Sequence, residues 1–287
     1  MAGKRKPLEK THMKYVDDFS ILEAVDRNSL VKDHNLPFPL NYHSRTEQIL
    51  PVSKSRVLQA VDDLKEYSAI HHMKINEEKS KLMLFNTSTV NDFTPVVKIN
   101  ETELEVVDEM KLLGVVLTSD VKWAKNTEYI TKKGFSRLWM MRRLKRLGAS
   151  DTDLLDTYIK QVRSILELAA PVWHPALTTY DRNQIERVQK SAFAIILGKS
   201  YRSYRHALET LEMDTLEERR ETLCLKFALK ASIHPTFKDW FKDFKMSRPR
   251  ECNTGDNARY VEPYTRTGRF EDSPIPYMTK LLNKHYG

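Results

Sequence analysis

The chain has 287 residues, and its 40% hydrophobic and 9% aromatic residues are enough to build a core, which excludes wholesale disorder. Lys and Arg number 47 against 39 Asp and Glu, and this net charge of +8 favours a polyanionic partner. Two cysteines, Cys224 and Cys252, are too few for a disulfide framework and favour a reducing compartment. Without an apolar run of about 20 residues or the apolar core of a signal peptide, we expect no membrane partner and an intracellular location, nuclear or cytoplasmic.

The first 120 residues alternate between short apolar runs and turn signals. Residues 13–25 hold two apolar segments around Asp17-Asp18, and because Asp suits turns better than strands, this predicts a strand–turn–strand unit. A helix is expected from Ser53 to about His71-His72, where apolar residues recur at helical spacing. Strand-like runs follow at 81–85, 96–99, 104–107 and 112–117, and a turn at Asn100-Glu101 predicts a hairpin of the second and third.

After Asp120 the pattern becomes helical. Pro171 and Gly198 are stop signals, and Thr215 to Glu218 matches a capping box. Helices are expected at about 122–146, 151–169, 181–197 and 215–231, and an irregular stretch at 247–276. The predicted class is therefore α+β, with an α/β part at 1–120, an α-helical part at 121–246 and an irregular tail at 247–287.

The acidic pair is the most specific chemical signal. Two adjacent carboxylates at a hairpin tip repel one another unless a cation lies beside them. Oxygen ligands of this kind suit Mg²⁺, which two-metal phosphoryl transfer uses to hold the attacking and departing oxygens. A Tyr-x-Asp-Asp string also arises by chance, so the strand–turn–strand context of Tyr15-Val16-Asp17-Asp18 is what gives it weight.

Several strings, in one order, resemble the reverse transcriptases of non-LTR retrotransposons of the jockey or CR1-like kind. Residues 15–19, Tyr-Val-Asp-Asp-Phe, resemble the metal-binding hairpin of the polymerase palm. Residues 73–81, Met-Lys-Ile-Asn-Glu-Glu-Lys-Ser-Lys, are similar to the Asn-x-x-Lys segment that follows it, and 112–117 to the strand near the primer grip. The segments 171–175, 185–192, 216–224 and 267–276 resemble the region after the palm and the closing residues of these proteins.

The resemblance implies the C-terminal part of a reverse-transcriptase palm, with short antiparallel strands and one helix, followed by an all-α thumb-like region. It makes Asp17 and Asp18 catalytic metal-binding carboxylates for Mg²⁺, with Asp17 the more direct ligand. Lys79 becomes a candidate phosphate contact, although an ordinary surface lysine fits equally well. The family's further palm aspartate lies well upstream of the hairpin, and Met1–Lys14 contains no Asp. We therefore expect a truncated RNA-directed DNA polymerase that is inactive alone and takes deoxynucleotides only if the missing palm is supplied.

The segment 122–146 carries the charge excess. Its nine Lys and Arg against one acid, Glu128, give a net of +8. On a helix, Ile130, Leu138, Met141 and Leu144 share one face, which we expect in the core, while Lys133 and Arg137 fit neither face and are expected at its edge. The opposite face is the candidate nucleic-acid surface, and it consists of Lys132, Phe135, Trp139, Arg142, Arg143 and Arg146.

Three functions remain open. The first is the truncated reverse transcriptase, whose basic helix holds an RNA or DNA primer–template duplex. The second is a nucleic-acid-binding module without chemistry, which the basic helix alone supports. The third is a helical protein-interaction remnant, for which 150–231 offers amphipathic surfaces. An ordinary cationic surface is the competing interpretation of the helix itself, and nothing in the sequence indicates the oligomeric state.

Overall fold

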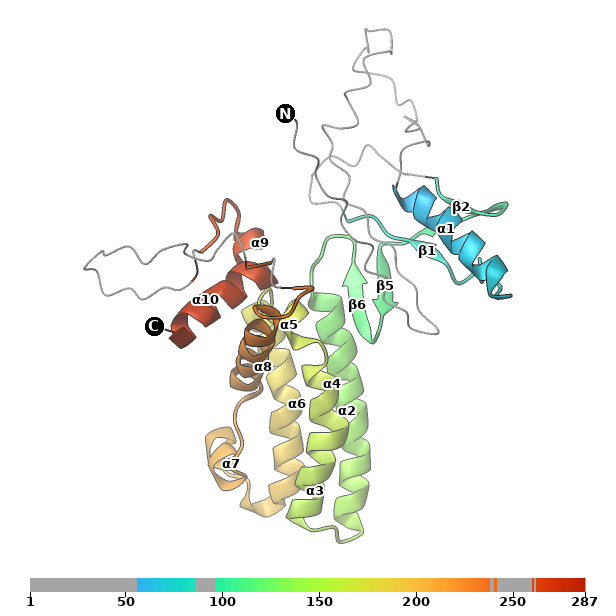
Figure 1. The fold of residues 1–287 in the computed structure, drawn as a ribbon. Coiled ribbons are helices and arrows are strands. Elements are labelled where there is room, and N and C mark those ends of the chain that lie inside the picture. Colours follow the sequence, from blue (N-terminus) through green and yellow to red (C-terminus); the bar gives the residue numbers. More distant parts are fainter. Residues whose placement is uncertain (1–55, 86–95, 238–239, 242–259, 261, 287) are drawn as a thin grey trace, which may run out of the picture. The chain divides into compact units, whose positions relative to one another are not determined.

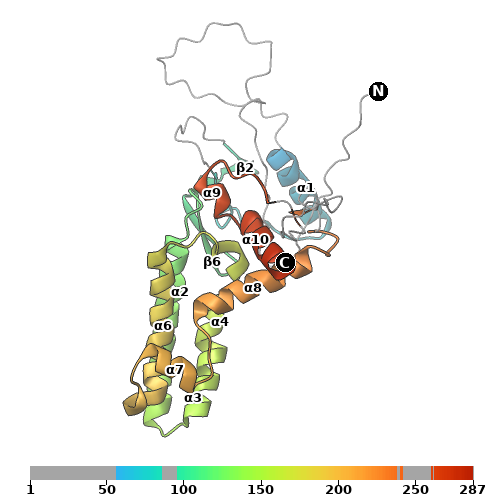
Figure 2. The same cartoon turned by 90° about the vertical axis from the view of Figure 1, so that its left-hand side faces the viewer.

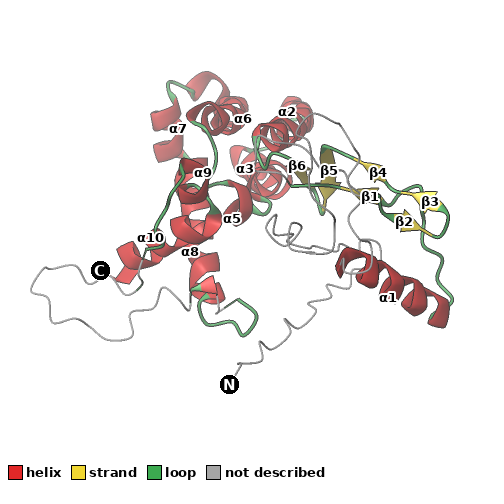
Figure 3. Cartoon of the chain, turned by 90° about the horizontal axis from the view of Figure 1, so that it is seen from above, coloured by secondary structure: helices red, strands yellow, loops and turns green. Residues whose placement is uncertain are grey.

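The computed structural model describes residues 56–85, 96–237, 240–241, 260 and 262–286. The predicted acidic hairpin at 13–25 lies outside these ranges. Within them the chain combines many helices with a few short strands, which confirms a mixed helix and strand composition, and the strands precede α2 in the sequence (Figures 1 and 3). The chain divides into two compact units, the first ending at Leu113 and the second beginning at Gly114.

In its described residues, the first unit contains one helix and short strands. The helix predicted from Ser53 is confirmed as α1 (Arg56–Ile70), whose Val61 packs with Val97, Ile99 and Leu104 in a small apolar core. The strands are β1 (Lys81–Leu82), β2 (Lys98–Ile99), β3 (Thr102–Glu103), β4 (Glu105–Val106) and β5 (Glu109–Leu112).

The hairpin prediction is confirmed at its turn. Strands β2 and β3 pair antiparallel around Asn100, whose φ of 55° is left-handed, a conformation that Asn tolerates well. The third predicted strand, 104–107, nevertheless does not pair along its length with the second. Its residues in β4 pair in parallel with β1 instead, and Lys81 lies opposite Glu105.

The single strand predicted at 112–117 is wrong. Leu113 and Gly114 have φ values of 48° and 90°, which end β5 and allow β6 (Val115–Thr118) to start in a new direction. A Cβ on Gly114 would lie 2.9 Å from a methyl carbon of Leu168, so the turn depends on glycine for space as well as for φ.

The second unit is built on long helices. Helix α2 (Ala124–Arg146) lies beside α6 (Thr179–Leu197) in both Figures 1 and 2, and the helical segment after α2 packs against the pair. That segment consists of α3 (Asp151–Thr157), the π-helical turn η2 (Tyr158–Arg163) and α4 (Ser164–Glu167). The remaining elements up to residue 231 are α5 (Ala170–Trp173), the 3₁₀ turn η3 (Gly198–Ser200), α7 (Tyr204–Thr210) and α8 (Leu216–Ala231).

All four expected helices are present, and reciprocal side-chain caps define three starts. The predicted box at Thr215 and Glu218 is confirmed at the start of α8. Equivalent boxes begin α3 at Ser150 and α6 at Thr178. Each box satisfies backbone N–H groups that lack a partner in the first turn of a helix, so the sequence determines these starts locally.

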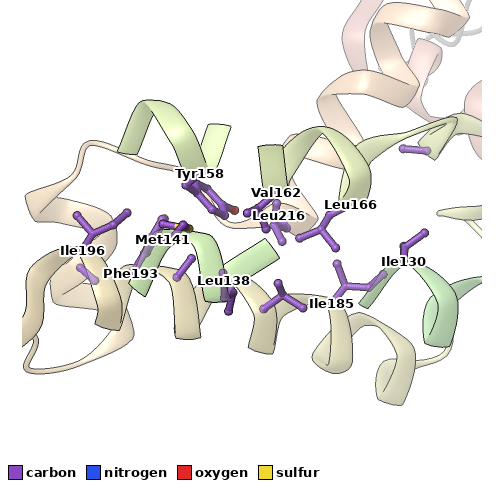
Figure 4. Packing of buried hydrophobic residues seen from close by; sticks show 14 of the residues in the cluster. Ile130, Leu138, Met141, Tyr158, Val162, Leu166, Ile185, Phe193, Ile196 and Leu216 are labelled. Atoms are coloured by element: carbon purple, nitrogen blue, oxygen red, sulfur yellow. The ribbon is translucent and has the colours of Figure 1, made fainter. Parts of the chain in front are cut away.

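The core of this unit lies between α2, α6 and the segment 151–167. Figure 4 shows Leu138 and Met141 from α2, Tyr158 from η2, and Ile185 and Phe193 from α6 pointing toward one another, and all five are fully buried. Burial raises the pKa of Tyr158, whose hydroxyl donates to Gln189, so this phenol stays neutral and hydrogen-bonded.

The irregular tail expected from 247 to the end is wrong in its last part. Residues 268–271 form α9 (Gly268–Glu271) and 274–286 form α10 (Pro274–Tyr286). Proline is tolerated in the first turn of a helix because the N–H groups there have no intrahelical partner, so Pro274 and Pro276 do not prevent α10. Met278 and Leu282 pack with Ala228, Ala231, Phe241 and Tyr260 in a second apolar cluster.

Throughout the described ranges, no helix is both long enough and apolar enough to cross a membrane.

The contact of α2 with α6 has little spare room at Gly134. An added Cβ would lie 2.9 Å from Val188 and 3.2 Å from Leu166, both of which are fully buried. We therefore predict that Gly134→Val lowers the free energy of unfolding by about 2 kcal/mol through overpacking. Gly268→Val is the control, because a Cβ at Gly268 meets nothing within 4 Å. Equal midpoints for the two variants in urea unfolding would contradict this packing.

Candidate nucleic-acid interface

Helix α2 has one buried and one exposed face. Ile130, Leu138 and Met141 are at most 2% exposed, and Leu144 is partly buried against the same core. This confirms the predicted core face. Since these residues repeat at helical spacing, their burial turns the opposite side of the helix outward.

Polar contacts tie both ends of α2 to its neighbours. At its start, the side chain of Asn126 accepts a hydrogen bond of 3.1 Å from the backbone N–H of Val116 in β6. At its end, the ammonium of Lys145 lies 2.6 Å from both the carboxylate of Asp151 and the carbonyl oxygen of Ile196. Lys145 therefore satisfies a carbonyl near the end of α6, and its charge is used within the fold.

The six predicted nucleic-acid residues all lie exposed on one face of α2. We call them the basic–aromatic face: Lys132, Phe135, Trp139, Arg142, Arg143 and Arg146. Trp139 is 58% exposed, and the guanidinium of Arg143 lies 5.6 Å from the centre of its ring, within cation–π range. Among the described residues, no carboxylate forms an ion pair with Arg142, Arg143 or Arg146, so these charges are available to an external anion.

The two cations that fitted neither face are exposed as well. Lys133 and Arg137 line a hollow of about 390 Å³ together with Ser136, Trp139 and Met140. The ammonium of Lys133 also lies 4.8 Å from the centre of the Tyr129 ring. A second hollow of about 380 Å³ is lined by Trp139, Arg143, Arg146 and Leu147. Helical spacing alone did not assign Lys133 and Arg137 to the exposed surface. Their exposure shows that the buried face of α2 ends before it reaches them.

Some of the positive charge on α2 can be explained by helix stability without any ligand. Arg143, Lys145 and Arg146 lie in the last turn of α2, where cations interact favourably with the partial negative charge of a helix C-terminus. This accounts for the last turn alone. It does not account for Lys132, Lys133 and Arg137, which lie more than one turn earlier.

The remaining predicted site residues, Lys79, Asp17 and Asp18, precede the second unit in the sequence. Lys79 lies exposed in the first unit, where its backbone N–H donates to the side chain of Asn76 at 3.1 Å. Its ammonium has no partner among the described residues, which suits a phosphate contact and an ordinary surface lysine equally. Asp17 and Asp18 lie outside the described ranges, so the Mg²⁺ site stays a prediction.

A buried polar cluster in the second unit was not predicted. The side chain of Arg220 in α8 is fully buried, and its Nε donates to Nδ1 of His174 at 3.3 Å. On the other side of the ring, Nε2 of His174 lies 3.4 Å from the hydroxyl of Tyr277 in α10. Trp173 is also fully buried, with the Arg220 guanidinium 5.9 Å from its ring centre.

The electrostatics of this cluster follow from its burial. Desolvation, the Arg220 charge and Arg182 together lower the pKa of His174 from 6.5 to about 3. Desolvation also lowers the pKa of Arg220, although the carboxylates of Glu186 and Glu217 oppose this. Since Nδ1 accepts from Arg220, neutral His174 carries its proton on Nε2, which faces Tyr277. The cluster thus links α5, α8 and α10 through a neutral imidazole.

Comparison of the chain with protein-family models, with curated proteins and with solved structures finds no match.

The His174 pKa predicts a pH dependence of stability. The unfolded chain takes up a proton as the pH falls through about 6.5, whereas folded His174 stays neutral down to about 3. The unfolded state binds more protons over this window, so stability falls as the pH falls. Between about pH 6.5 and pH 5 we expect this residue to contribute a loss on the order of 1.5 kcal/mol.

Urea unfolding of the full chain at a series of pH values measures this slope. His174→Gln, whose amide oxygen can still accept from Arg220, should flatten the slope over that range. The control is His234→Gln, because His234 is exposed. An unchanged slope in His174→Gln would show that this imidazole titrates alike in both states.

Proposed function

We propose that this chain is part of an RNA-directed DNA polymerase of the non-LTR retrotransposon kind, and that the basic–aromatic face of α2 binds the primer–template duplex. The observation that carries the proposal is the set of exposed cations on one side of α2, without carboxylate partners among the described residues, around a solvent-exposed tryptophan. The strings that resemble the family, from the palm hairpin onward, supply the polymerase context.

The dimensions of the face suit a nucleic-acid backbone. Lys132 and Arg146 are fourteen residues apart, which at 1.5 Å per residue is about 21 Å along the helix. One strand of a duplex advances about 3.4 Å per phosphate, so the face is as long as about six nucleotides. Arginines in such a row hold phosphates in register without reading bases, which suits a polymerase that must accept any sequence.

The resemblance assigns the catalytic chemistry to the N-terminal part of the chain. In this proposal Asp17 and Asp18 bind Mg²⁺, and Lys79 contacts a phosphate near that site. The α+β part followed by packed helices has the order of a palm and a thumb. The first alternative, a nucleic-acid-binding module without catalytic activity, requires only the basic–aromatic face of α2. The second, a helical protein-interaction module, would use the helices of the second unit without nucleic-acid binding by that face.

The α2 assignment predicts how charge removal changes binding. Replacing Arg142, Arg143 and Arg146 by Gln should weaken primer–template binding by at least tenfold. Each phosphate contact that the variant lacks reduces the number of counterions that binding releases from the nucleic acid. If each arginine contacts one phosphate, the slope of log affinity against log salt should become shallower by about 2.7. Fluorescence anisotropy of a labelled RNA–DNA duplex over a salt series measures both.

The matched control removes the same three charges elsewhere. Arg187, Lys226 and Lys230 are exposed on α6 and α8, and their replacement by Gln should leave the salt slope nearly unchanged. Equal effects of the two triple variants would mean that net charge alone drives binding. Failure of the original chain to bind duplex at low salt would refute the proposed function, and binding of a protein ligand without salt dependence would favour the interaction protein.

The catalytic part has its own test. Because a single carboxylate pair holds Mg²⁺ weakly, we expect the chain to bind an annealed primer on an RNA template without extending it. Mg²⁺-dependent extension that Asp17→Asn with Asp18→Asn abolishes would show instead that this chain completes the metal site. Gel analysis of the labelled primer distinguishes the two outcomes, and duplex binding by the same preparation controls for folding.

A further inference from the structure

Trp139 has a place on α2 that phosphate contacts alone do not explain. It forms a wall of both hollows on the exposed face, one toward the N-terminal side with Lys133 and Arg137, the other toward the C-terminal side with Arg143 and Arg146. We propose that Trp139 is a stacking platform for an unpaired base, and that the cations on its two sides hold the flanking phosphates of a single strand. The inference rests on the proposed nucleic-acid binding by α2 and adds a ligand class to it.

The exposure of Trp139 is the first support. The other described tryptophans are better covered: Trp123 is 7% exposed, Trp173 is fully buried, and Trp240, 39% exposed, has the rings of Phe227 and Phe237 beside it. Trp139 is 58% exposed, and no aromatic ring of the described residues packs against it. A large ring that is exposed beside exposed cations, and not packed against other rings, is available to an external ligand.

The arrangement around the ring is the second support. Arg143 lies over the indole at 5.6 Å, so one side of Trp139 already has a cationic neighbour. The hollow toward the N-terminal side adds the methionine side chain of Met140, the hydroxyl of Ser136 and two cations. An aromatic wall, an apolar side chain and flanking charge are the features that sequence-tolerant single-strand sites combine, because every base has a π-face to stack.

A duplex does not use such a platform. Bases inside a helix are stacked on their neighbours, so their faces are not accessible to a protein ring, whereas unpaired bases can splay outward and stack on aromatic residues. The same arginines can contact phosphates of either ligand. Trp139 therefore distinguishes unpaired strand from duplex, while Arg142 and Arg146 serve both.

The experiment compares three ligands with equal numbers of phosphates per strand: a 12-nucleotide oligo(dT), an abasic 12-mer, and a 12-base-pair duplex. Anisotropy titrations use the full chain, the variants Trp139→Ala and Trp139→Phe, and Trp240→Ala as a matched control at another exposed tryptophan. Trp139→Ala should weaken oligo(dT) binding by about tenfold, equivalent to about 1.4 kcal/mol. Its affinities for the abasic strand and the duplex should change less than twofold.

Two further comparisons separate stacking from a general loss of structure. Trp139→Phe should recover most of the oligo(dT) affinity, because a phenyl ring still stacks, and Trp240→Ala should bind all three ligands as the original chain does. An equal loss on duplex and oligo(dT) in Trp139→Ala, or no loss on either, overturns this inference while the duplex-binding proposal stands. Absence of binding to every ligand by the original chain overturns both.

Discussion

The packing of α2 against α6 is the constraint on which the rest of the second unit depends. Gly134 allows the two helices to approach so closely that a Cβ there would lie 2.9 Å from Val188. With this side of α2 fully buried against α6 and the segment 151–167, its charged residues can only face solvent. The surface chemistry of α2 is thus a consequence of an apolar contact on its opposite side.

That packing also sorts the cations of the segment 122–146 into two groups. Lys122 pairs with Asp120 at 3.1 Å and Lys145 with Asp151, so these two serve the local fold. Exposed ion pairs of this kind contribute little to stability, and here they place a carboxylate beside each of these two cations. The exposed arginines around Trp139 have no such carboxylate among the described residues, which concentrates the charge where an aromatic ring is also exposed.

The C-terminal helices are held by a different kind of interaction. Arg220, His174 and Tyr277 form a buried chain of polar contacts from α8 through α5 to α10, beside an apolar cluster that includes Met278 and Leu282. The terminal nitrogens of Arg220 have no hydrogen-bond partner among the described residues, an arrangement that costs stability unless something else satisfies it.

Local signals in the sequence were sufficient for the four longer helical segments between residues 122 and 231 and for the exposed face of α2, because capping boxes and apolar spacing act within one or two turns. They failed at Leu113-Gly114, where left-handed φ angles divide an apolar run, and at α10, whose prolines fall in its first turn. They could not place Lys133 and Arg137 in a hollow with Trp139, pair Lys145 with α6, or bring Arg220 to His174. Those contacts join residues whose proximity or exposure is decided by how whole helices pack, and packing is a property of the tertiary structure rather than of any short segment.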